Sequence, residues 1–371
     1  MDHACAFFGI KSNSPDTSQP GSAAFPAWHD APDTVFSSRS NTFIPQSVRS
    51  SMELLFAPME GITDGIFRTT HASVFGGIDH YYIPFISPTV NGHFDRREMR
   101  LLFPSDKALL SAVPQILCKD PSLFLHCTDM LRELGFMEVN LNVGCPSGTV
   151  TAKGKGSGML LDLDSLKRFL DQIYTSASLP VSVKTRIGYV SEDEWPALLD
   201  IYKNYPIEKL IIHPRTRQDF YKGPIHRHAL ESLDDLPFPW IINGDITTTE
   251  LIYQAVQQYH CTGVMVGRGF LTNPGLARQI KTGQKMCLSE LVTFHDTLFK
   301  AYQAELPPNA VLGRMREITK YFSFCFAHSD KAIKRLFKAK SIEQYLDSAA
   351  LLFSLPFIDD PCYPSSADVE S

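Results

Sequence analysis

A cysteine stands directly after one of the apolar runs of this chain, in the stretch Asn142-Val143-Gly144-Cys145-Pro146. Glycine permits a tight turn and proline stiffens the exit, so the pattern presents a thiol at the end of a strand. A free cysteine has a pKa of about 8.5 and is mostly protonated at neutral pH, which suits it to donate a proton. A nucleophile and a buried structural thiol are the alternatives, and the strand-end position favours chemistry.

Lys184 occupies a similar place near the end of the run Val181–Arg186. Because side chains alternate along a strand, Lys184 can face the interior while Val183 faces the other way. A buried ammonium needs an anionic partner. A neighbouring carboxylate would serve, and so would the N1–C2=O edge of a reduced flavin, so both interpretations stay open.

The ends of the last two apolar runs predict a phosphate site. They carry the tripeptides Asn243–Asp245 and Gly267–Gly269, and the run before them ends in His213 and Arg215. Glycines admit an anion to backbone N–H groups, and Arg268 can neutralise it. Each tripeptide alone is an ordinary turn, but barrels commonly bind phosphate after their last two strands. A nearby glycine-rich stretch, 154–158, lacks the full dinucleotide pattern and is interpreted as a mobile lid.

Eight short apolar runs recur along the chain, and each is followed by enough residues for one helix. This alternation predicts an α/β fold, a (β/α)8 TIM barrel, whose active site lies where the strands end. The segments between the runs have helical patterns, several of which begin with Asp, Ser or Thr as a cap. The runs are Leu54–Met59, Tyr81–Phe85, Val113–Leu117, Glu138–Gly144, Val181–Arg186, Leu210–Arg215, Trp240–Asp245 and Val264–Gly269.

The rest of the sequence predicts parts on either side of this barrel. Residues 1–50 are rich in Ser, Pro, Asn and Asp and lack a sustained period, so we expect a flexible N-terminal extension, with Met52 as a candidate native start. The barrel is expected over residues 51–285. Helical patterns then predict a small C-terminal helical bundle domain over 286–356, followed by a flexible tail over 357–371.

Composition favours a folded cytoplasmic enzyme. The 371 residues, 44% of them hydrophobic, permit a large domain and a smaller one. No apolar stretch approaches the roughly 20 residues that cross a bilayer, and the N-terminus lacks the basic lead-in of a secretory signal. The eight cysteines form no CxxC pair or zinc-like spacing. We therefore expect reduced thiols, no metal, no membrane association and a monomer.

Positive charge is concentrated near the C-terminus. The segment Arg314–Lys340 contains eight Lys or Arg against two acidic residues, a net charge of +6, whereas the whole chain carries −5. The remainder is therefore strongly acidic. A local basic face on an acidic protein can steer a polyanion to one place, although a solvated helix surface would have the same composition.

In chain order, these motifs resemble those of the tRNA-dihydrouridine synthases, flavin enzymes that reduce uridine in tRNA. The resemblance spans residues 54–280, and the helical tail is similar in character to the family's RNA-binding domain. Departures at Val143, Gly148 and Pro214 concern the RNA contacts and the subfamily rather than the flavin chemistry. The matching stretches are Ala57–Asp64 with Phe67 and Arg68, Asn142–Ser147, Val181–Gly188, His213–Thr216 with Tyr221 and Gly223, Asn243–Asp245 and Gly267–Gly269.

The resemblance implies FMN-dependent reduction of the C5=C6 bond of specific tRNA uridines to dihydrouridine, with NAD(P)H, NADPH being expected, as reductant. Because this bond is conjugated to the C4 carbonyl, hydride from FMN is expected at C6 and a proton from Cys145 at C5. The uridine must leave the RNA stack to reach a barrel mouth.

The resemblance also implies a set of site residues. FMN is expected to be held by Pro58, Met59, Glu60, Gln115, Lys184, His213, Asn243, Gly244, Asp245, Gly267 and Arg268. The substrate is expected to contact Asn142, Arg215 and Tyr221, and the tRNA backbone to contact Arg314, Arg316, Lys320, Lys334, Arg335 and Lys338.

Two alternatives remain open. A TIM-barrel FMN oxidoreductase acting on a small molecule, similar to dihydroorotate dehydrogenase, would share the phosphate loops but need no basic helical domain. A non-catalytic RNA-binding protein would keep the basic face but would have no reason to place Cys145 and Lys184 at strand ends.

Overall fold

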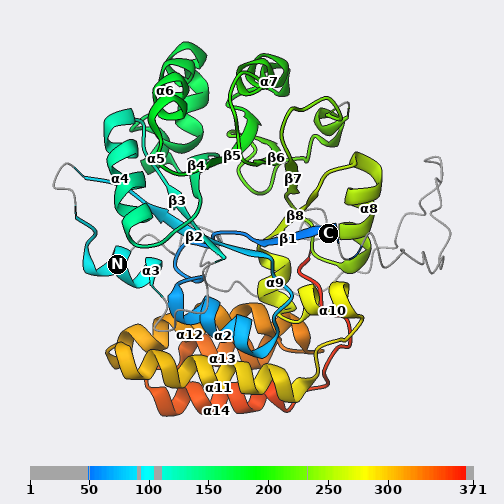
Figure 1. Ribbon diagram of the computed structural model, residues 1–371. Helices are drawn as coiled ribbons and strands as arrows, with labels where there is room; N and C mark the ends of the chain where they lie inside the picture. The colour runs from blue at the N-terminus through cyan, green and yellow to red at the C-terminus, as the bar shows by residue number, and fades with distance from the viewer. Residues whose placement is uncertain (1–48, 50, 90–92, 104–110, 232, 365–371) are drawn as a thin grey trace, which may run out of the picture. The chain divides into compact units, whose positions relative to one another are not determined.

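Eight parallel strands close into a barrel in chain order, with β1 (Glu53–Phe56) paired to β8 (Gly263–Val266). The computed structural model describes residue 49 and residues 51–89, 93–103, 111–231 and 233–364. The expected N-terminal extension, residues 1–50, lies outside the described residues except for residue 49. The closed barrel confirms the predicted TIM-barrel fold (Figure 1).

The strands and helices alternate as the apolar runs predicted. The other strands are β2 (His80–Ile86), β3 (Ala112–Ile116), β4 (Val139–Val143), β5 (Val181–Gly188), β6 (Leu210–Thr216) and β7 (Trp240–Asn243). The helices around them are α2 (Gly65–Val74), α3 (Arg96–Leu102), α4 (Pro121–Glu133), α5 (Gly148–Thr151), α6 (Leu163–Ser176), α7 (Trp195–Tyr202), α8 (Thr249–Tyr259), α9 (Arg268–Thr272) and α10 (Leu276–Thr282).

Helix α6 illustrates how the sequence forms these elements. The Asp162 side chain caps it by accepting a hydrogen bond from the Ser165 N–H at 2.9 Å, a contact that typically contributes about 1 kcal/mol. Apolar residues recur at helical spacing, so one face of the helix packs on the protein interior while the other meets water. The buried residues of this face are Leu166, Phe169, Leu170 and Ile173.

The barrel interior is apolar on one side and polar on the other. Buried polar side chains come from β3, β4 and β5: Gln115, Asn140, Asn142 and Ser182. A buried polar group costs free energy unless it is hydrogen-bonded, so these side chains must find hydrogen-bond partners within the protein. The apolar cluster that fills much of the rest contains Leu55, Ala57, Tyr82, Val113, Ile211, Ile241 and Met265.

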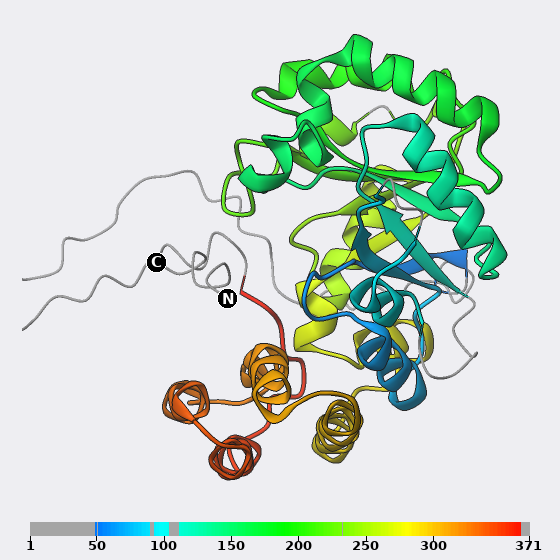
Figure 2. The same ribbon diagram turned by 90° about the vertical axis from the view of Figure 1, so that its left-hand side faces the viewer.

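Four further helices follow the barrel, as the sequence predicted for the C-terminal region. Helix α12 packs between α11 and α13 (Figure 2). A buried hydrogen-bond chain joins three of them, because the Tyr345 hydroxyl lies 2.7 Å from both His295 Nε2 and Thr319 Oγ1. The helices are α11 (Leu288–Glu305), α12 (Pro308–Phe322), α13 (Asp330–Lys338) and α14 (Ile342–Phe353).

Helix α11 packs against α2 of the barrel through aromatic side chains. The ring of Phe294 lies 5.6 Å from that of Phe67 and 5.3 Å from that of Phe75, both in edge-to-face geometry. Beside them, the Tyr302 hydroxyl donates to Asp64 Oδ1 at 2.8 Å. The same carboxylate caps α2 at the N–H of Phe67, so one residue begins a barrel helix and anchors the helical region.

The end of the described chain is anchored, which differs from the flexible tail expected over 357–371. The Ile358 N–H donates to the Cys325 carbonyl at 2.9 Å, and Phe357 forms a β-bridge with Phe326. Asp360 pairs with Lys285. These bonds, together with ring contacts of Phe357 with Phe326 and of Tyr363 with Phe324, anchor residues 357–364. Residues 365–371 lie outside the described part of the chain.

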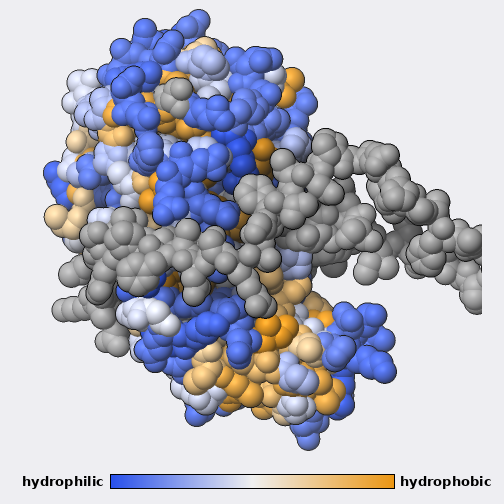
Figure 3. All heavy atoms as spheres, turned by 90° about the vertical axis from the view of Figure 1, so that its right-hand side faces the viewer, coloured by the Kyte–Doolittle hydropathy of each residue, from blue (hydrophilic) through white to orange (hydrophobic). Residues whose placement is uncertain are grey.

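Surface character differs between the barrel and the helical region. In Figure 3 the upper part of the visible face is mostly hydrophilic, whereas apolar residues gather over the helices below. In the described part of the chain, every helix is too short or too polar to cross a membrane. Exposed large apolar side chains of the helical region and the following segment include Phe337, Leu346, Leu351 and Ile358.

Replacing Phe294 with alanine should lower the free energy of unfolding by about 3–5 kcal/mol, because a fully buried ring is removed from the α11–α2 contact. Urea unfolding measures this loss. Phe337→Ala is the matched control: its ring is 41% exposed, and the change should stay within about 0.5 kcal/mol. Equal losses in both variants would contradict the packing described for Phe294.

Candidate active site

Cys145 follows β4, and its loop is fixed from both sides. Asn142 Oδ1 accepts hydrogen bonds from the N–H groups of Gly144 at 3.1 Å and Cys145 at 2.9 Å. The Cys145 carbonyl accepts from the N–H and the hydroxyl of Ser157 at 3.1 and 2.8 Å. These bonds leave the loop little freedom, so the thiol has a defined position at the barrel mouth.

The glycine-rich stretch 154–158, interpreted from the sequence as a mobile lid, is part of this support. Gly156 has φ +58°, and a Cβ there would lie 2.9 Å from the Cys145 carbonyl oxygen. Residues Gly156–Leu161 form a 3₁₀ helix whose first five residues are buried. The glycines therefore permit close packing beneath Cys145.

The Cys145 thiol lies among charged groups but remains protonated at neutral pH. Burial raises the pKa of the thiol, and the nearby Glu60 carboxylate acts in the same direction. The Arg186 and Lys184 cations oppose this effect by favouring the thiolate. Since the net shift is upward, the group suits proton donation better than nucleophilic attack.

Lys184 faces the barrel interior next to the Cys145 strand. It lies opposite Asn142 in the β4–β5 register, and Val183 belongs to the apolar core on the other face. Its Nζ donates to Asn243 Oδ1 at 2.7 Å, and Asn243 Nδ2 donates to the Met265 carbonyl at 2.7 Å. Burial lowers the pKa of Lys184 to about 7, and Arg186 adds to the effect. Because Asn243 is a neutral amide, its hydrogen bond does not neutralise the charge of a protonated Lys184.

Arg186 ties three strand ends together, a role that the sequence analysis did not assign. Its Nε donates to the Gly144 carbonyl at 2.9 Å and its NH1 donates to the Thr216 carbonyl at 2.7 Å. The guanidinium lies 5.3 Å from the centroid of the Tyr221 ring. Two-residue spacing from Lys184 on one strand could have indicated that both side chains share a face.

Tyr221 lies at the mouth on the loop after β6. Its side chain is 41% exposed, and its ring centroid lies 6.4 Å from that of His213. Asp219 holds this loop by accepting from the Thr216 N–H at 2.6 Å and from the Thr216 hydroxyl at 2.7 Å. His226 Nε2 lies 3.1 Å from the same carboxylate, so the loop that carries Tyr221 is well braced.

Arg215, which was expected to contact the substrate, is held by groups of the protein itself. Its side chain is fully buried, its NH2 pairs with Asp245 at 2.7 Å, and its Nε donates to the Gly223 carbonyl at 2.7 Å. Arg268 pairs with the other oxygen of Asp245. Because side chains alternate along β6, Arg215 points inward, where it orients Asp245.

His213 is neutral and has a defined tautomer. Burial lowers its pKa, and the neighbouring cations Arg186, Lys184, Arg215 and Arg268 lower it further. Nε2 lies 3.3 Å from Arg215 NH1, which can only donate. Nε2 is therefore the acceptor, and Nδ1 carries the proton that can be donated to a ligand.

Glycines allow the last strand ends to approach their neighbours closely. Gly244 has φ +122°, and a Cβ there would lie 2.9 Å from His213 Cδ2. A Cβ on Gly267 would lie 2.9 Å from Met59 Sδ. The loop after β7 thus approaches β6, and the loop after β8 approaches the one after β1, at positions that no larger residue could occupy without a shift.

Glu60 lies between the barrel and the helical region. It pairs with Arg97 of α3, and burial raises its pKa while the Arg97 and Arg314 cations lower it. Arg314 of α12 also lies 3.5 Å from Asp64 Oδ2. Of the basic residues expected to meet RNA, Arg314 therefore reaches the mouth.

The other basic residues lie farther along the helical region. Arg316 and Lys320 are half-buried on α12. Lys334, Arg335 and Lys338 are exposed on α13, whose buried face consists of Ala332 and Leu336. The structure thus separates the expected RNA contacts into a group on α12 and an exposed face on α13.

The remaining predicted flavin residues lie on the same ends of the strands. Pro58 and Met59 follow β1, and Asn142 Nδ2 donates to Gln115 Oε1 of β3 at 2.6 Å. Tyr363, which the sequence did not indicate, lies over Arg268 with 4.8 Å between the guanidinium carbon and the ring centroid. It belongs to the anchored terminal segment, for which no local pattern predicted a place near the site.

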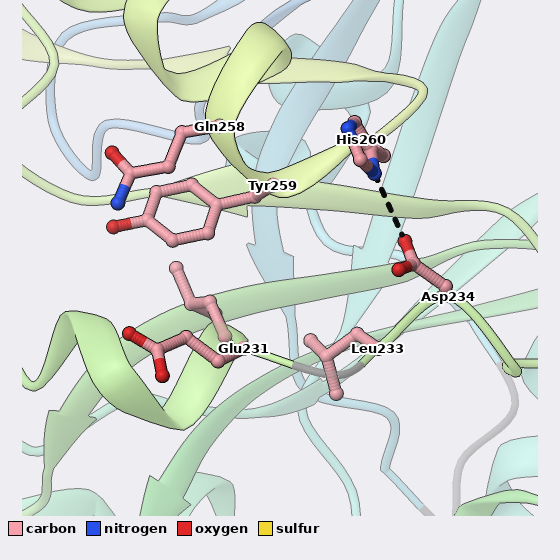
Figure 4. A pocket seen from close by; sticks show the side chains of 7 residues that line it. Glu231, Leu233, Asp234, Gln258, Tyr259 and His260 are labelled. Carbon is pink, nitrogen blue, oxygen red and sulfur yellow. Dashed lines mark hydrogen bonds and ion pairs between the residues drawn. The ribbon is translucent and has the colours of Figure 1, made fainter.

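A surface pocket of about 300 Å³ lies at the opposite end of the barrel (Figure 4). Leu233 and Asp234 of its lining precede β7, and Tyr259 and His260 precede β8, so they lie where those strands begin. Parallel strands place Cys145 at the other end. In the described ranges, no group of three or more His, Cys, Asp or Glu side chains is placed to hold a metal ion.

Comparison with known proteins identifies the family. A model described as dihydrouridine synthase (Dus) matches residues 55–351. The chain belongs to the dihydrouridine synthase family. It is similar to the probable tRNA-dihydrouridine synthase of Staphylococcus aureus (strain MRSA252), with 33% identity over 262 residues, 68% of this chain and 78% of that protein. The probable tRNA-dihydrouridine synthase 2 of Bacillus subtilis (strain 168) is 33% identical over 261 residues, 68% and 79% of the two chains.

Among solved structures, this dihydrouridine synthase family member is similar to histamine dehydrogenase from Rhizobium sp. 4-9. The TM-score is 0.49 at 10% identity, and the match covers 65% of this chain and 49% of that one.

Alkylation of Cys145 by iodoacetamide should follow a pH profile whose midpoint lies above that of a short unstructured peptide spanning Cys145, because burial raises the pKa of the thiol. Mass spectrometry of the peptide containing Cys145 gives the rate at each pH. A midpoint below that of the unstructured peptide would indicate an activated nucleophile and contradict the proton-donor assignment.

Proposed function

We propose that this protein is a tRNA-dihydrouridine synthase that reduces the C5=C6 bond of uridine in tRNA, with FMN as cofactor and NADPH as reductant. The observation that carries the proposal is that a protonated Cys145 thiol and an inward-facing Lys184 lie at the same end of the barrel. Family membership and the tRNA-directed names of relatives support the same substrate. A tRNA substrate also favours a cytoplasmic location, and we propose a monomer.

The residues at the mouth fit FMN. An anionic partner such as the electron-rich edge of the reduced ring would favour the charged form of Lys184. His213 offers a neutral N–H donor, and the glycine-bearing ends of β7 and β8 suit a phosphate. When bound, FMN supplies the hydride chemistry of the reduction. The residues proposed to hold it are Pro58, Met59, Glu60, Gln115, Lys184, His213, Asn243, Gly244, Asp245, Gly267 and Arg268.

Cys145 is the proposed proton donor to C5 of the uracil ring. Its protonated state supplies the proton, and the bonds from Asn142 and Ser157 to its loop fix where the proton is delivered. Asn142 and Tyr221 are proposed contacts of the flipped base. Arg215 acts indirectly, by orienting Asp245 and His213.

The basic helices are proposed to hold the RNA while the uridine leaves its stack. Flipping a base out costs a few kcal/mol, which contacts to the phosphate backbone offset. Arg314 lies at the mouth, where it can meet RNA next to the reacting base. The proposed backbone contacts are Arg314, Arg316, Lys320, Lys334, Arg335 and Lys338.

Cys145→Ala should retain FMN and its reduction by NADPH but lose dihydrouridine formation by about 10²–10⁴-fold, the usual contribution of a general acid. Flavin absorbance and dihydrouridine yield on tRNA measure the two effects. Cys127→Ala, which removes a buried thiol from α4, is the control and should keep full turnover. Normal turnover of the Cys145 variant would overturn its assigned role.

Replacing Lys334, Arg335 and Lys338 with alanine should weaken tRNA binding and flatten its salt dependence by about one unit of slope per lost phosphate contact. Titration at several salt concentrations gives the slope, and FMN content should not change. The charge-matched control replaces Lys167, Arg168 and Lys203, which are exposed on or next to barrel helices α6 and α7. Equal losses in both triple variants would mean that α13 has no special part in binding.

A further inference from the structure

A chain of buried hydrogen bonds runs through the polar side of the barrel, from the Cys145 loop toward the start of β4. Asn142 Nδ2 donates to Gln115 Oε1 at 2.6 Å, and Gln115 Nε2 donates to Asn140 Oδ1 at 2.7 Å. Asn140 Nδ2 then donates to Ser182 Oγ at 2.9 Å, and Ser182 Oγ donates to Glu138 Oε1 at 2.5 Å. We call these five side chains the polar relay.

The direction of the polar relay is fixed independently at its two ends. At the mouth, the N–H groups of Gly144 and Cys145 can only donate, so Asn142 must present its oxygen to them and its NH₂ to Gln115. At the other end, an ionised Glu138 can only accept, so the Ser182 hydroxyl must donate to it. Both ends demand the same order of donors and acceptors.

The interior members have few other partners with which to satisfy their groups. Gln115, Asn140 and Ser182 are each at most 1% exposed. Water therefore cannot readily replace a missing bond. If the amide of Gln115 or Asn140 turned over, its NH₂ would face another NH₂ and its oxygen would face another oxygen. Among the described residues, weaker alternative partners of Ser182 Oγ are the Val139 carbonyl at 3.4 Å and the Tyr82 hydroxyl.

We propose that Glu138 is a positioning residue for Cys145: its carboxylate demands the same direction of the polar relay as the loop N–H groups do, and it thereby reinforces the hold of the Asn142 oxygen on the loop that carries the thiol. It acts through Ser182, Asn140, Gln115 and Asn142, and touches neither the loop nor the mouth. That Cys145 donates a proton rests on the proposed function, whereas the relay itself does not.

The surroundings of Glu138 include groups that stabilise its ionised form. Burial raises the pKa of this carboxyl overall, and Glu208 adds to the rise, while the Ser182 hydroxyl, Lys209 and His80 limit it. Lys209 also pairs with Glu53 at the start of β1. Opposite charges therefore surround the start of β4, where the polar relay ends.

The test compares changes that break the polar relay with changes that spare it. Glu138→Met keeps the side-chain length but removes the acceptor, and Ser182→Ala removes a central member. Glu138→Gln retains an acceptor oxygen. Tyr82→Phe removes a hydroxyl that contacts Ser182 and lies 3.4 Å from Glu138, and it leaves all four bonds of the relay in place. All four are made in the full-length, FMN-loaded protein, and their thermal unfolding is recorded.

The first readout is the alkylation rate of Cys145 by iodoacetamide, which requires no tRNA. Glu138→Met and Ser182→Ala should speed it about fivefold, the factor for losing one net hydrogen bond of about 1 kcal/mol from the loop. Glu138→Gln and Tyr82→Phe should match the unaltered protein. Unchanged rates in both relay-breaking variants, or the same acceleration in Tyr82→Phe, would overturn the proposal.

The second readout separates positioning from binding in turnover on tRNA. The relay-breaking variants should lose about 10- to 100-fold in kcat, as a misplaced catalytic group does, with KM for tRNA unchanged and with recovery in Glu138→Gln. A rise in KM alone would contradict a positioning role. The two proposals can fail separately. If the relay-breaking variants change the alkylation rate but Cys145→Ala keeps full turnover, the role of Glu138 in positioning the loop stands and the proposed proton donor is refuted.

Discussion

The need to satisfy buried polar groups governs the interior of this barrel. On the β3–β5 side, amide and hydroxyl groups replace the apolar side chains that fill the rest, and each must find a partner because water is excluded. The partners they find are one another and the backbone of the Cys145 loop. Stability and the geometry of the mouth therefore depend on the same bonds.

A second constraint joins the barrel to the helical region. The Asp64 carboxylate caps α2, accepts from Tyr302 of α11 and lies near Arg314 of α12. Aromatic packing of Phe294 excludes water beside it. The apolar contact thus fixes where a basic helix approaches the mouth, which is the geometry that the proposed reaction on a polyanion requires.

The periodicity of apolar residues predicted the barrel well. It did not predict features that depend on contacts between residues far apart in the sequence. The alternation of apolar runs is local and located all eight strands. The anchored segment 357–364 was expected to be flexible, because its partners Cys325, Phe326 and Lys285 are distant in sequence. Arg215 was expected at the substrate from the family resemblance, and its contacts with Asp245 and the Gly223 carbonyl could not be predicted because those groups belong to other segments.

The sequence by itself determined the eight-stranded barrel, the helical region and the strand-end positions of Cys145 and Lys184, because these follow from residue spacing along the chain. Only the tertiary structure decided which groups meet. The orientation of Asn142, the tautomer of His213 and the link from Glu138 to the thiol loop depend on donors and acceptors from several strands. The spacing of residues along one strand does not determine which side chains of neighbouring strands form hydrogen bonds with each other.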